Sequence, residues 1–258
     1  MSSIDIVIVN WNVGSQLREC LSSIRQSAGS VGLLNKVVIV DNASTDDSLL
    51  GLDGLDLPMI LIQNDQNRGF AVACNQGARA SSADYVLFLN PDCRLFSDSL
   101  IEPFRFMENP MNSKVGVVGV QLINEKGYVS RTCARFPTLF GFVARSLGLD
   151  ILLPGAIRGF AMNEWNHLDS RPVDQVIGAF YFVRRRVFES LGGFDEQFFV
   201  YMEELDFSLR ARNAGWSTYY LAEATAFHKG GGASEQVKAQ RLFYSIRSRI
   251  LYSYKHFS

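Results

Sequence analysis

Short apolar runs alternate with segments of helical pattern along the N-terminal part of the chain, and this alternation constrains the fold most strongly. The apolar runs have the length of strands and cover residues 4–9, 36–40, 59–62 and 85–89. Helical periodicity or capping residues lie between them, at residues 16–26, 46–52 and 70–80. This order predicts an α/β fold whose mostly parallel central sheet carries helices on both faces.

The second half of the chain is less regular. It predicts a strand over residues 115–120, and a turn at 125–127 within the segment 122–129. A buried strand over 176–183, a short extended stretch over 198–201 and a helix over 203–214 follow. Residues 136–165 are rich in glycine and aromatic side chains without a clean period, so the sequence predicts no structure for them.

Composition limits the classes of function. A chain of 258 residues with 47% hydrophobic content can bury one sizeable core, so we expect a single domain over residues 1–258. The formal net charge of −1 gives no general attraction to nucleic acid, which is not an expected partner. No CxxC pair, signal peptide or membrane-spanning run is present, so reduced thiols and a cytoplasmic location are expected.

Polar residues follow each of the first strands at the point where it ends. They are Asn10 and Asn12, residues 41–46, residues 64–69, and residues 90–92. Ligands of parallel α/β sheets bind beyond the carboxyl ends of the strands. We therefore expect these side chains to converge on one crevice, although isolated polar residues there would be ordinary turn chemistry.

Two aspartates at this edge are candidate ligand-binding residues. Asp92 ends a proline-stiffened turn, where a fixed carboxylate could hold Mg²⁺ or Mn²⁺ together with substrate phosphates. An Asn-Pro-Asp sequence more often just makes a turn. Asp41 is the last residue of its strand and could accept hydrogen bonds from a nucleobase, whereas the hydroxyls of Ser44 and Thr45 are explained by helix capping.

The segment from Asn67 to Gly77 reads as a glycine-containing helix start. Gly69 would let the backbone approach a phosphate at the helix N-terminus, and Asn75 lies further along the helix. The segment lacks GxxxxGK[ST], which excludes an ATPase P-loop, and no GxGxxG follows a strand, which argues against a dinucleotide dehydrogenase.

Acidic residues open the helix predicted over 203–214. Carboxylates in a first turn complement the helix dipole, and Asp206 and Arg210 are spaced to pair, so a structural explanation covers most of them. A remaining carboxylate could act as a general base on a hydroxyl. His228 precedes a glycine-rich loop and could complete a metal shell, although a lone histidine is more often structural.

Taken in order, these motifs resemble those of the family two nucleotide-sugar glycosyltransferases with the GT-A fold, and within them the bacterial rhamnosyltransferase-like branch. The segments that carry the resemblance are residues 8–12, 40–46, 67–77, 89–92, 178–206 and 228–234. The resemblance implies a nucleotide-binding half over about residues 1–95, an acceptor and catalytic half over about 96–235, and a C-terminal helix over about 236–258.

The resemblance also implies roles for individual residues. Asp92 matches the last position of a DxD-type motif that binds Mn²⁺ or Mg²⁺, Asn90 stands where many members have aspartate, and His228 matches a metal-contacting histidine. Glu203-Glu204 stands where the family usually has Glu-Asp, so Glu204 is the expected base and Glu203 the alternative. The implied nucleotide and donor contacts are Asn10, Asn12, Asp41, Asn67, Gly69, Asn75, Asn90 and Asp92.

The implied reaction is an inverting displacement that moves a sugar from a nucleoside diphosphate to a hydroxyl of a glycan or lipid-linked acceptor in surface polysaccharide synthesis. dTDP-rhamnose is the first expected donor, and UDP-hexoses come next. One alternative is a non-catalytic nucleotide-sugar-binding protein. A nucleotidyltransferase would need a basic glycine-rich loop that residues 10–14 do not form, and a glycoside hydrolase has no need of Asp41 or residues 67–77.

The C-terminal segment 241–255 mixes basic with aromatic and aliphatic residues. One interpretation is peripheral contact with an anionic membrane surface, which would place the protein at the inner face of the membrane. A terminal helix that packs on its own domain, or on a second subunit, explains the same pattern.

Overall fold

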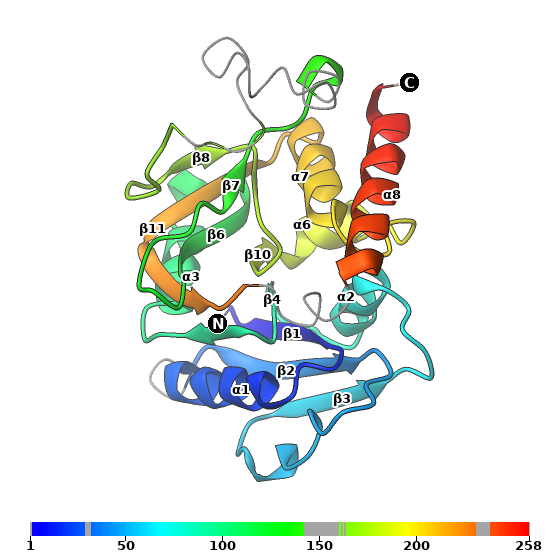
Figure 1. Cartoon of the computed structure of the whole chain (residues 1–258). Coiled ribbons are helices and arrows are strands. Elements are labelled where there is room, and N and C mark those ends of the chain that lie inside the picture. Colours follow the sequence, from blue (N-terminus) through cyan, green and yellow to red (C-terminus); the bar gives the residue numbers. More distant parts are fainter. Residues whose placement is uncertain are drawn as a thin grey trace.

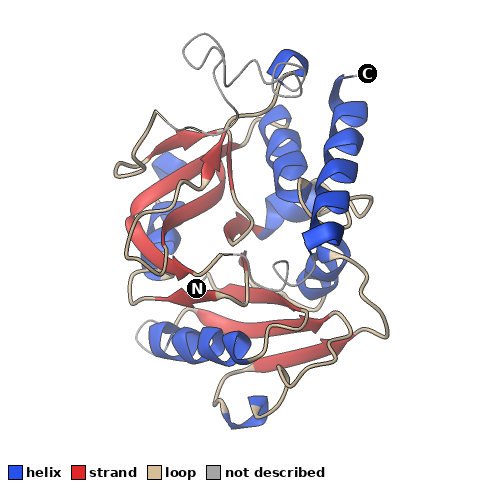
Figure 2. Cartoon of the chain, in the orientation of Figure 1, coloured by secondary structure: helices blue, strands red, loops and turns tan. Residues whose placement is uncertain are grey.

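The structure is a computed structural model, and one mixed β-sheet runs through it (Figures 1 and 2). It describes residues 2–28, 32–141, 160, 162, 164–230 and 238–257. Within these residues the sheet has nine strands in the order β3-β2-β1-β4-β10-β6-β11-β5, with β8 paired to β11.

Four parallel strands form the N-terminal part of the sheet, as the sequence predicts. They are β1 (Ile4–Asn10), β2 (Leu34–Asp41), β3 (Met59–Gln63) and β4 (Tyr85–Leu89). Asn10 pairs with Asp41, and Asp41 pairs with Gln63. The last residues of three neighbouring strands are therefore level with one another, at one edge of the sheet.

The remaining strands make the sheet mixed. They are β5 (Cys93–Leu95), β6 (Val115–Ile123), β8 (Arg171–Val173), β10 (Phe180–Arg184) and β11 (Ser217–His228). β10 is antiparallel to β4 and β6, whereas β11 is parallel to β6 and antiparallel to β5. A separate two-stranded sheet pairs β7 (Cys133–Ala134) with β9 (Gln175–Val176).

Helices cover both faces of the sheet, because side chains alternate between two hydrophobic cores along each buried strand. In β1, Ile4, Ile6 and Ile8 face one core, whereas Val7 and Val9 face the other. The first core also contains residues of α1 (Ser15–Ala28) and is adjoined by α3 (Ile101–Glu108). The second core contains residues of α2 (Phe70–Arg79), α6 (Arg185–Ser190) and α7 (Glu203–Asn213).

Helix α2 packs very closely on the sheet at Gly77. A Cβ atom at this position would lie 2.3 Å from Cγ1 of Val7. Because that distance is far below van der Waals contact, the glycine lets the helix approach the strand. The helix that follows the third polar segment is thereby held tightly against β1.

Three of the sequence predictions are wrong in detail. Residues 46–52 form bends and turns that lead to a 3₁₀ turn at Leu52–Gly54, and the hydroxyl of Ser44 bonds Asp41 and Asn12 instead of capping a helix. The strand predicted over 176–183 is interrupted at residues 177–179. The extended stretch predicted over 198–201 is absent, because residues 199–202 form bends, and Tyr201 and Met202 have left-handed φ values of 69° and 72°.

The predicted turn at residues 125–127 is confirmed, with Gly127 at a φ of 76°. Two 3₁₀ turns, Leu52–Gly54 and Pro110–Asn112, and the C-terminal helix α8 (Lys238–Phe257) complete the described elements.

The four cysteines are buried and free. Among the described residues, we find no helix with the length and apolar character needed to cross a membrane. Most of the segment 136–165 lies outside the described residues.

Candidate functional site

Asn10 and Asp41 form a buried polar pair at the ends of β1 and β2. The Asn10 amide nitrogen lies 2.7 Å from Oδ1 of Asp41 and also contacts the hydroxyls of Ser44 and Ser48. Asp41 further accepts bonds from the backbone N–H and the hydroxyl of Ser44. The side-chain oxygen of Asn10, Oδ1, is buried and has no hydrogen-bond partner among the described residues, so one acceptor at this pair is unpaired.

Asn12 ties the first polar loop to the second. Its side-chain oxygen accepts a bond of 2.7 Å from the backbone N–H of Thr45, and its own backbone N–H donates to Ser44. Gly14 donates its N–H to Asp46 across the same gap. The first two polar loops therefore lie together at one edge of the sheet, as expected. Many of their polar groups form hydrogen bonds between the loops.

The third polar loop joins the same edge through Asn42. Its amide nitrogen donates to the carbonyl oxygen of Gly69, and its side-chain oxygen accepts from Asn64. Asn67 accepts the backbone N–H of Gly69. A Cβ atom on Gly69 would lie 2.5 Å from the backbone oxygen of Phe199, so glycine is required there by the loop that precedes α7.

Asn75 lies inside α2 and is almost fully buried. Its amide nitrogen donates to the Phe194 carbonyl and to Glu196, and its oxygen accepts the backbone N–H of Phe194. The side chain therefore braces α2 against the loop before α7. A polar residue within a helix is typical of a residue that contacts the sugar donor. It is equally typical of a residue that holds a helix to a neighbouring loop, as Asn75 does here.

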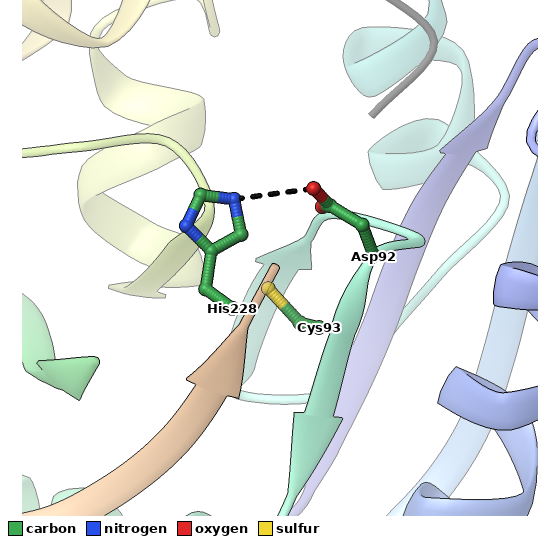
Figure 3. A group of neighbouring side chains, drawn as sticks. All are labelled: Asp92, Cys93 and His228. Carbon is green, nitrogen blue, oxygen red and sulfur yellow. Dashed lines mark ion pairs between the residues drawn. The ribbon is translucent and has the colours of Figure 1, made fainter. Parts of the chain in front are cut away.

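Asp92 and His228 come together at the end of the antiparallel β5–β11 pair (Figure 3). His228 is paired with Cys93 in the strand register, which places its ring beside the residue before Cys93. The His228 Nε2 atom lies 3.4 Å from Oδ2 of Asp92, and both side chains are largely buried. The backbone N–H of Lys229 donates to the Asp92 carbonyl and continues the pairing.

Cys93 is the third potential ligand of this cluster, since ligand atoms of Asp92, Cys93 and His228 all lie within 4.8 Å of one another. The Cys93 thiol is completely buried and donates to the Ala179 carbonyl. Burial, reinforced by Asp92 and Cys20, raises the pKa of this thiol well above its ordinary value. Asp92 and His228 are therefore the better ligand pair for a hard or borderline cation.

The spacing of these two atoms fits a shared ion. Two ligands at right angles on an ion with bonds of about 2.1 Å lie roughly 3 Å apart. The observed 3.4 Å between Asp92 and His228 is close to that separation. Asn90 holds the turn in place through its backbone. Its N–H donates to the Ala179 carbonyl, and its own carbonyl accepts the N–H of Cys93.

Glu203 and Glu204 begin α7 as a buried acidic pair. Burial raises the pKa of both carboxyls, and the neighbouring Glu204 raises that of Glu203 further. Each has one carboxyl oxygen, Oε2, that is buried without a hydrogen-bond partner among the described residues. Two carboxyls in such surroundings do not ionise together readily.

Glu204 contacts the backbone between β9 and β10. Its carboxyl accepts a hydrogen bond from the backbone N–H of Gly178. The next residue, Ala179, bonds the backbone of Asn90 and the thiol of Cys93. A short chain of contacts thus joins Glu204 to the turn that carries Asp92, through the interruption between β9 and β10.

A cavity of about 400 Å³ lies beside Asp92, between the start of α1 and the end of β11. Its lining includes Asn12, Asp46, Asp92 and the basic residues Arg94 and Lys229. Arg94 stacks over Phe227 and lies 3.4 Å from Glu19. The sequence patterns did not indicate a role for these two basic residues. Lys229 directly follows His228, and Arg94 lies two residues after Asp92, so both are close to predicted metal ligands in the sequence.

Asp206 anchors the C-terminal helix to α7. The predicted pair with Arg210 is present at 2.7 Å, and α8 adds Lys255 and His256, each 2.8 Å from the Asp206 carboxylate. Figure 1 shows α8 beside α7. Asp206 is completely buried, so it serves as the charged centre of this contact and is not available as a base.

Comparison with known proteins gives consistent matches. Residues 5–192 match the family described as "Glycosyl transferase family 2". The chain is 25% identical over 263 residues to the low-salt glycan biosynthesis hexosyltransferase Agl10 of Haloferax volcanii, which covers 100% of this chain and 78% of that protein. It is 24% identical over 270 residues to the N-acetylglucosaminyl-diphospho-decaprenol L-rhamnosyltransferase of Mycobacterium tuberculosis, covering 96% and 82%.

Solved structures show the same fold. The mannosyltransferase PcManGT from Pyrobaculum calidifontis, in complex with GDP-Man and Mn²⁺, superposes with a TM-score of 0.63 at 20% identity. The match covers 96% of this chain and 64% of that structure. The expected GT-A fold is thereby confirmed.

Proposed function

Because the chain belongs to glycosyl transferase family 2 and is a glycosyltransferase, we propose that it moves a sugar from a nucleoside diphosphate to an acceptor hydroxyl with inversion at the anomeric carbon. The observation that carries this proposal is the Asp92–His228 pair, which lies at the same sheet edge as Asn10 and Asp41 and is linked to Glu204.

The nucleoside would bind at the ends of β1 and β2. Asp41 is fixed by Asn10 and Ser44, so its carboxylate is held in one orientation for a base N–H. The unpartnered side-chain oxygen of Asn10 is a second acceptor at the same place. Buried acceptors of this kind favour a ligand that supplies N–H donors, because leaving them unpaired costs free energy.

Asp92 and His228 would hold a divalent cation, Mn²⁺ or Mg²⁺, and the separation of their ligand atoms fits one ion. The PcManGT structure, which contains Mn²⁺ and GDP-Man, supports this assignment. Such an ion neutralises negative charge on a departing diphosphate. Arg94 and Lys229 line the adjoining cavity but are paired with Glu19 and Glu125, so they would contact the same phosphates only after exchanging these partners.

Glu204 would act as the general base. It would accept the proton of the acceptor hydroxyl while that oxygen bonds to the anomeric carbon, and the bond from this carbon to the diphosphate oxygen would break. Burial raises the pKa of Glu204, which brings it closer to neutral pH and makes the carboxylate a better proton acceptor. A single displacement of this kind inverts the anomeric centre.

The names of the relatives support a choice of sugar and acceptor. The M. tuberculosis relative is named as an N-acetylglucosaminyl-diphospho-decaprenol L-rhamnosyltransferase, which supports rhamnose as the transferred sugar and a lipid-linked glycan as acceptor, and dTDP-rhamnose is the first donor that we propose. The H. volcanii relative is named as a hexosyltransferase in glycan biosynthesis, which supports a hexose, and a UDP-linked hexose is the second donor that we propose.

Calorimetric titration with dTDP and with UDP, in the presence and absence of Mn²⁺, tests the site. We expect one nucleotide to bind more tightly with Mn²⁺, and Asp92→Ala to weaken that binding at least about tenfold. Asp56→Ala, at an exposed aspartate paired only with Arg25, is the matched control and should bind as the wild type does. Failure of both nucleotides to bind under every condition would contradict the proposed site.

A further inference from the structure

The outward face of α8 exposes a row of large apolar side chains to solvent. Five of them are between 48% and 77% exposed, namely Leu242, Phe243, Ile246, Ile250 and Tyr254. They recur at the spacing of one face of a helix. A contiguous exposed stripe of this kind marks an interaction surface more often than an isolated apolar residue does.

The opposite face of α8 is already docked on the protein. Tyr252 is completely buried, the Ser248 hydroxyl donates to the Val200 carbonyl, and the ring of Tyr244 stacks on Phe199 at 4.4 Å between centroids. Lys255 pairs with Asp195 and Asp206. The helix is therefore held firmly in place, and the apolar stripe is not the face that fixes it to its own domain.

The charges on α8 favour one kind of partner. The helix has no acidic residue, and it contains Lys238, Arg241, Arg247, Arg249 and Lys255. With about 100° between successive residues of a helix, Arg249 falls on one edge of the stripe and Arg247 on the other. An apolar stripe bordered by arginines is the pattern of a helix that lies in the interface of an anionic bilayer, with its cationic groups at the headgroups.

We propose that the outward face of α8 rests on a membrane that contains anionic lipids. The five apolar side chains enter the boundary between headgroups and acyl chains, and Arg247 and Arg249 contact lipid phosphates. A second copy of the chain fits this face less well, because a two-fold contact would place two acid-free, basic helices against each other. The inference depends only on the surface of α8, and not on which sugar the enzyme transfers.

Membrane contact would have a clear consequence for a lipid-linked acceptor. Through Asp206, α8 is bonded to the same helix that begins with Glu203 and Glu204. A bilayer held by α8 would therefore keep a fixed relation to the proposed base. An acceptor anchored in that bilayer would be concentrated near the site.

Flotation of the full chain with vesicles tests the proposal. One set of vesicles consists of phosphatidylcholine alone, and the other contains phosphatidylglycerol as well. We expect binding to the anionic vesicles that decreases with added salt, since the attraction of basic residues is screened. Ile246→Ser and Ile250→Ser should each lower the partition coefficient about tenfold, as expected for the lost burial of one large aliphatic side chain.

Matched variants separate the surface from general effects. Arg247→Gln with Arg249→Gln should lower binding to anionic vesicles and leave the residual binding to neutral vesicles unchanged. Met111→Ser removes another exposed apolar residue, at 90% exposure, and should have no effect. Nucleotide titration of every variant in solution shows that the fold is kept, because none of these residues lies at the proposed site.

Two results would overturn the proposal. One is vesicle binding that is absent, or unchanged by the isoleucine and arginine substitutions. The other is a dimer in sedimentation equilibrium that Ile250→Ser converts to monomer, which would assign the face to a second copy. Neither result bears on nucleotide binding, so failure here is distinct from failure of the proposed reaction.

Discussion

His228 and Asp92, far apart in the sequence, lie with Nε2 and Oδ2 only 3.4 Å apart because β5 and β11 pair edge to edge. The register that joins His228 to Cys93 places the end of β11 beside the turn that carries Asp92, directly before β5. If the two residues bind an ion as proposed, they would lose little conformational freedom, because strand pairing already holds them close together.

His228→Ala tests the second ligand independently of the first. We expect the affinity for Mn²⁺, measured by titration in the presence of saturating nucleotide, to fall at least about tenfold. Nucleotide binding measured without metal should stay unchanged, which serves as the internal control. Unaltered Mn²⁺ affinity would mean that His228 only supports Asp92 structurally.

The two glutamates of α7 should differ in their effect on turnover. Glu204→Gln removes the proposed proton acceptor, so we expect kcat to fall by about 10²- to 10⁴-fold with nearly unchanged donor affinity. Glu203→Gln keeps the buried shape and should leave kcat within about tenfold of the wild type. Steady-state kinetics with both variants decides the assignment, and the reverse order of effects would make Glu203 the base.

The buried Glu203 carboxyl should make stability depend on pH. Its pKa in the folded protein is raised well above the ordinary value of 4.5 by burial and by Glu204. Above pH 4.5 the unfolded chain loses this proton while the folded protein keeps it. The stabilisation is therefore complete below pH 4.5 and is lost as the pH rises toward the raised pKa, by up to about 1.4 kcal/mol per pH unit.

Urea denaturation of the wild type and of Glu203→Gln between pH 4.5 and 8 measures this effect. The difference in unfolding free energy should shift in favour of the variant as the pH rises, because glutamine does not ionise. The remaining dependence of the variant reports on groups such as Glu204. Parallel curves for the two proteins would show that Glu203 is ionised in the folded state.

Asp206→Asn should loosen the C-terminal helix. The substitution leaves Arg210, Lys255 and His256 without their shared carboxylate, so we expect a loss of about 3 kcal/mol in unfolding free energy. Limited proteolysis should then cut α8 sooner than in the wild type. Glu102→Gln, which removes only an exposed pair with Arg105, is the control and should cost at most about 1 kcal/mol.

Local apolar pattern was sufficient for the N-terminal elements. The strands β1 to β4 and the helices α1 and α2 agree with the predictions within a few residues. β1, β2 and β4 separate the two cores, and each helix faces one of them. The helix predicted over 46–52 was wrong, and the hydroxyl of Ser44, one of its two expected capping residues, instead bonds Asp41 and the backbone N–H of Asn12.

The sequence by itself determined the α/β order, the edge at which polar residues gather, and the kinds of residue available there. Only the tertiary structure decided that Asp92 meets His228, that Asn75 braces the loop at Phe194, and that Asp206 holds α8. The physical reason is that secondary structure follows from side-chain periodicity along a short segment. Contacts between distant segments depend instead on strand register and helix docking, which the whole core sets.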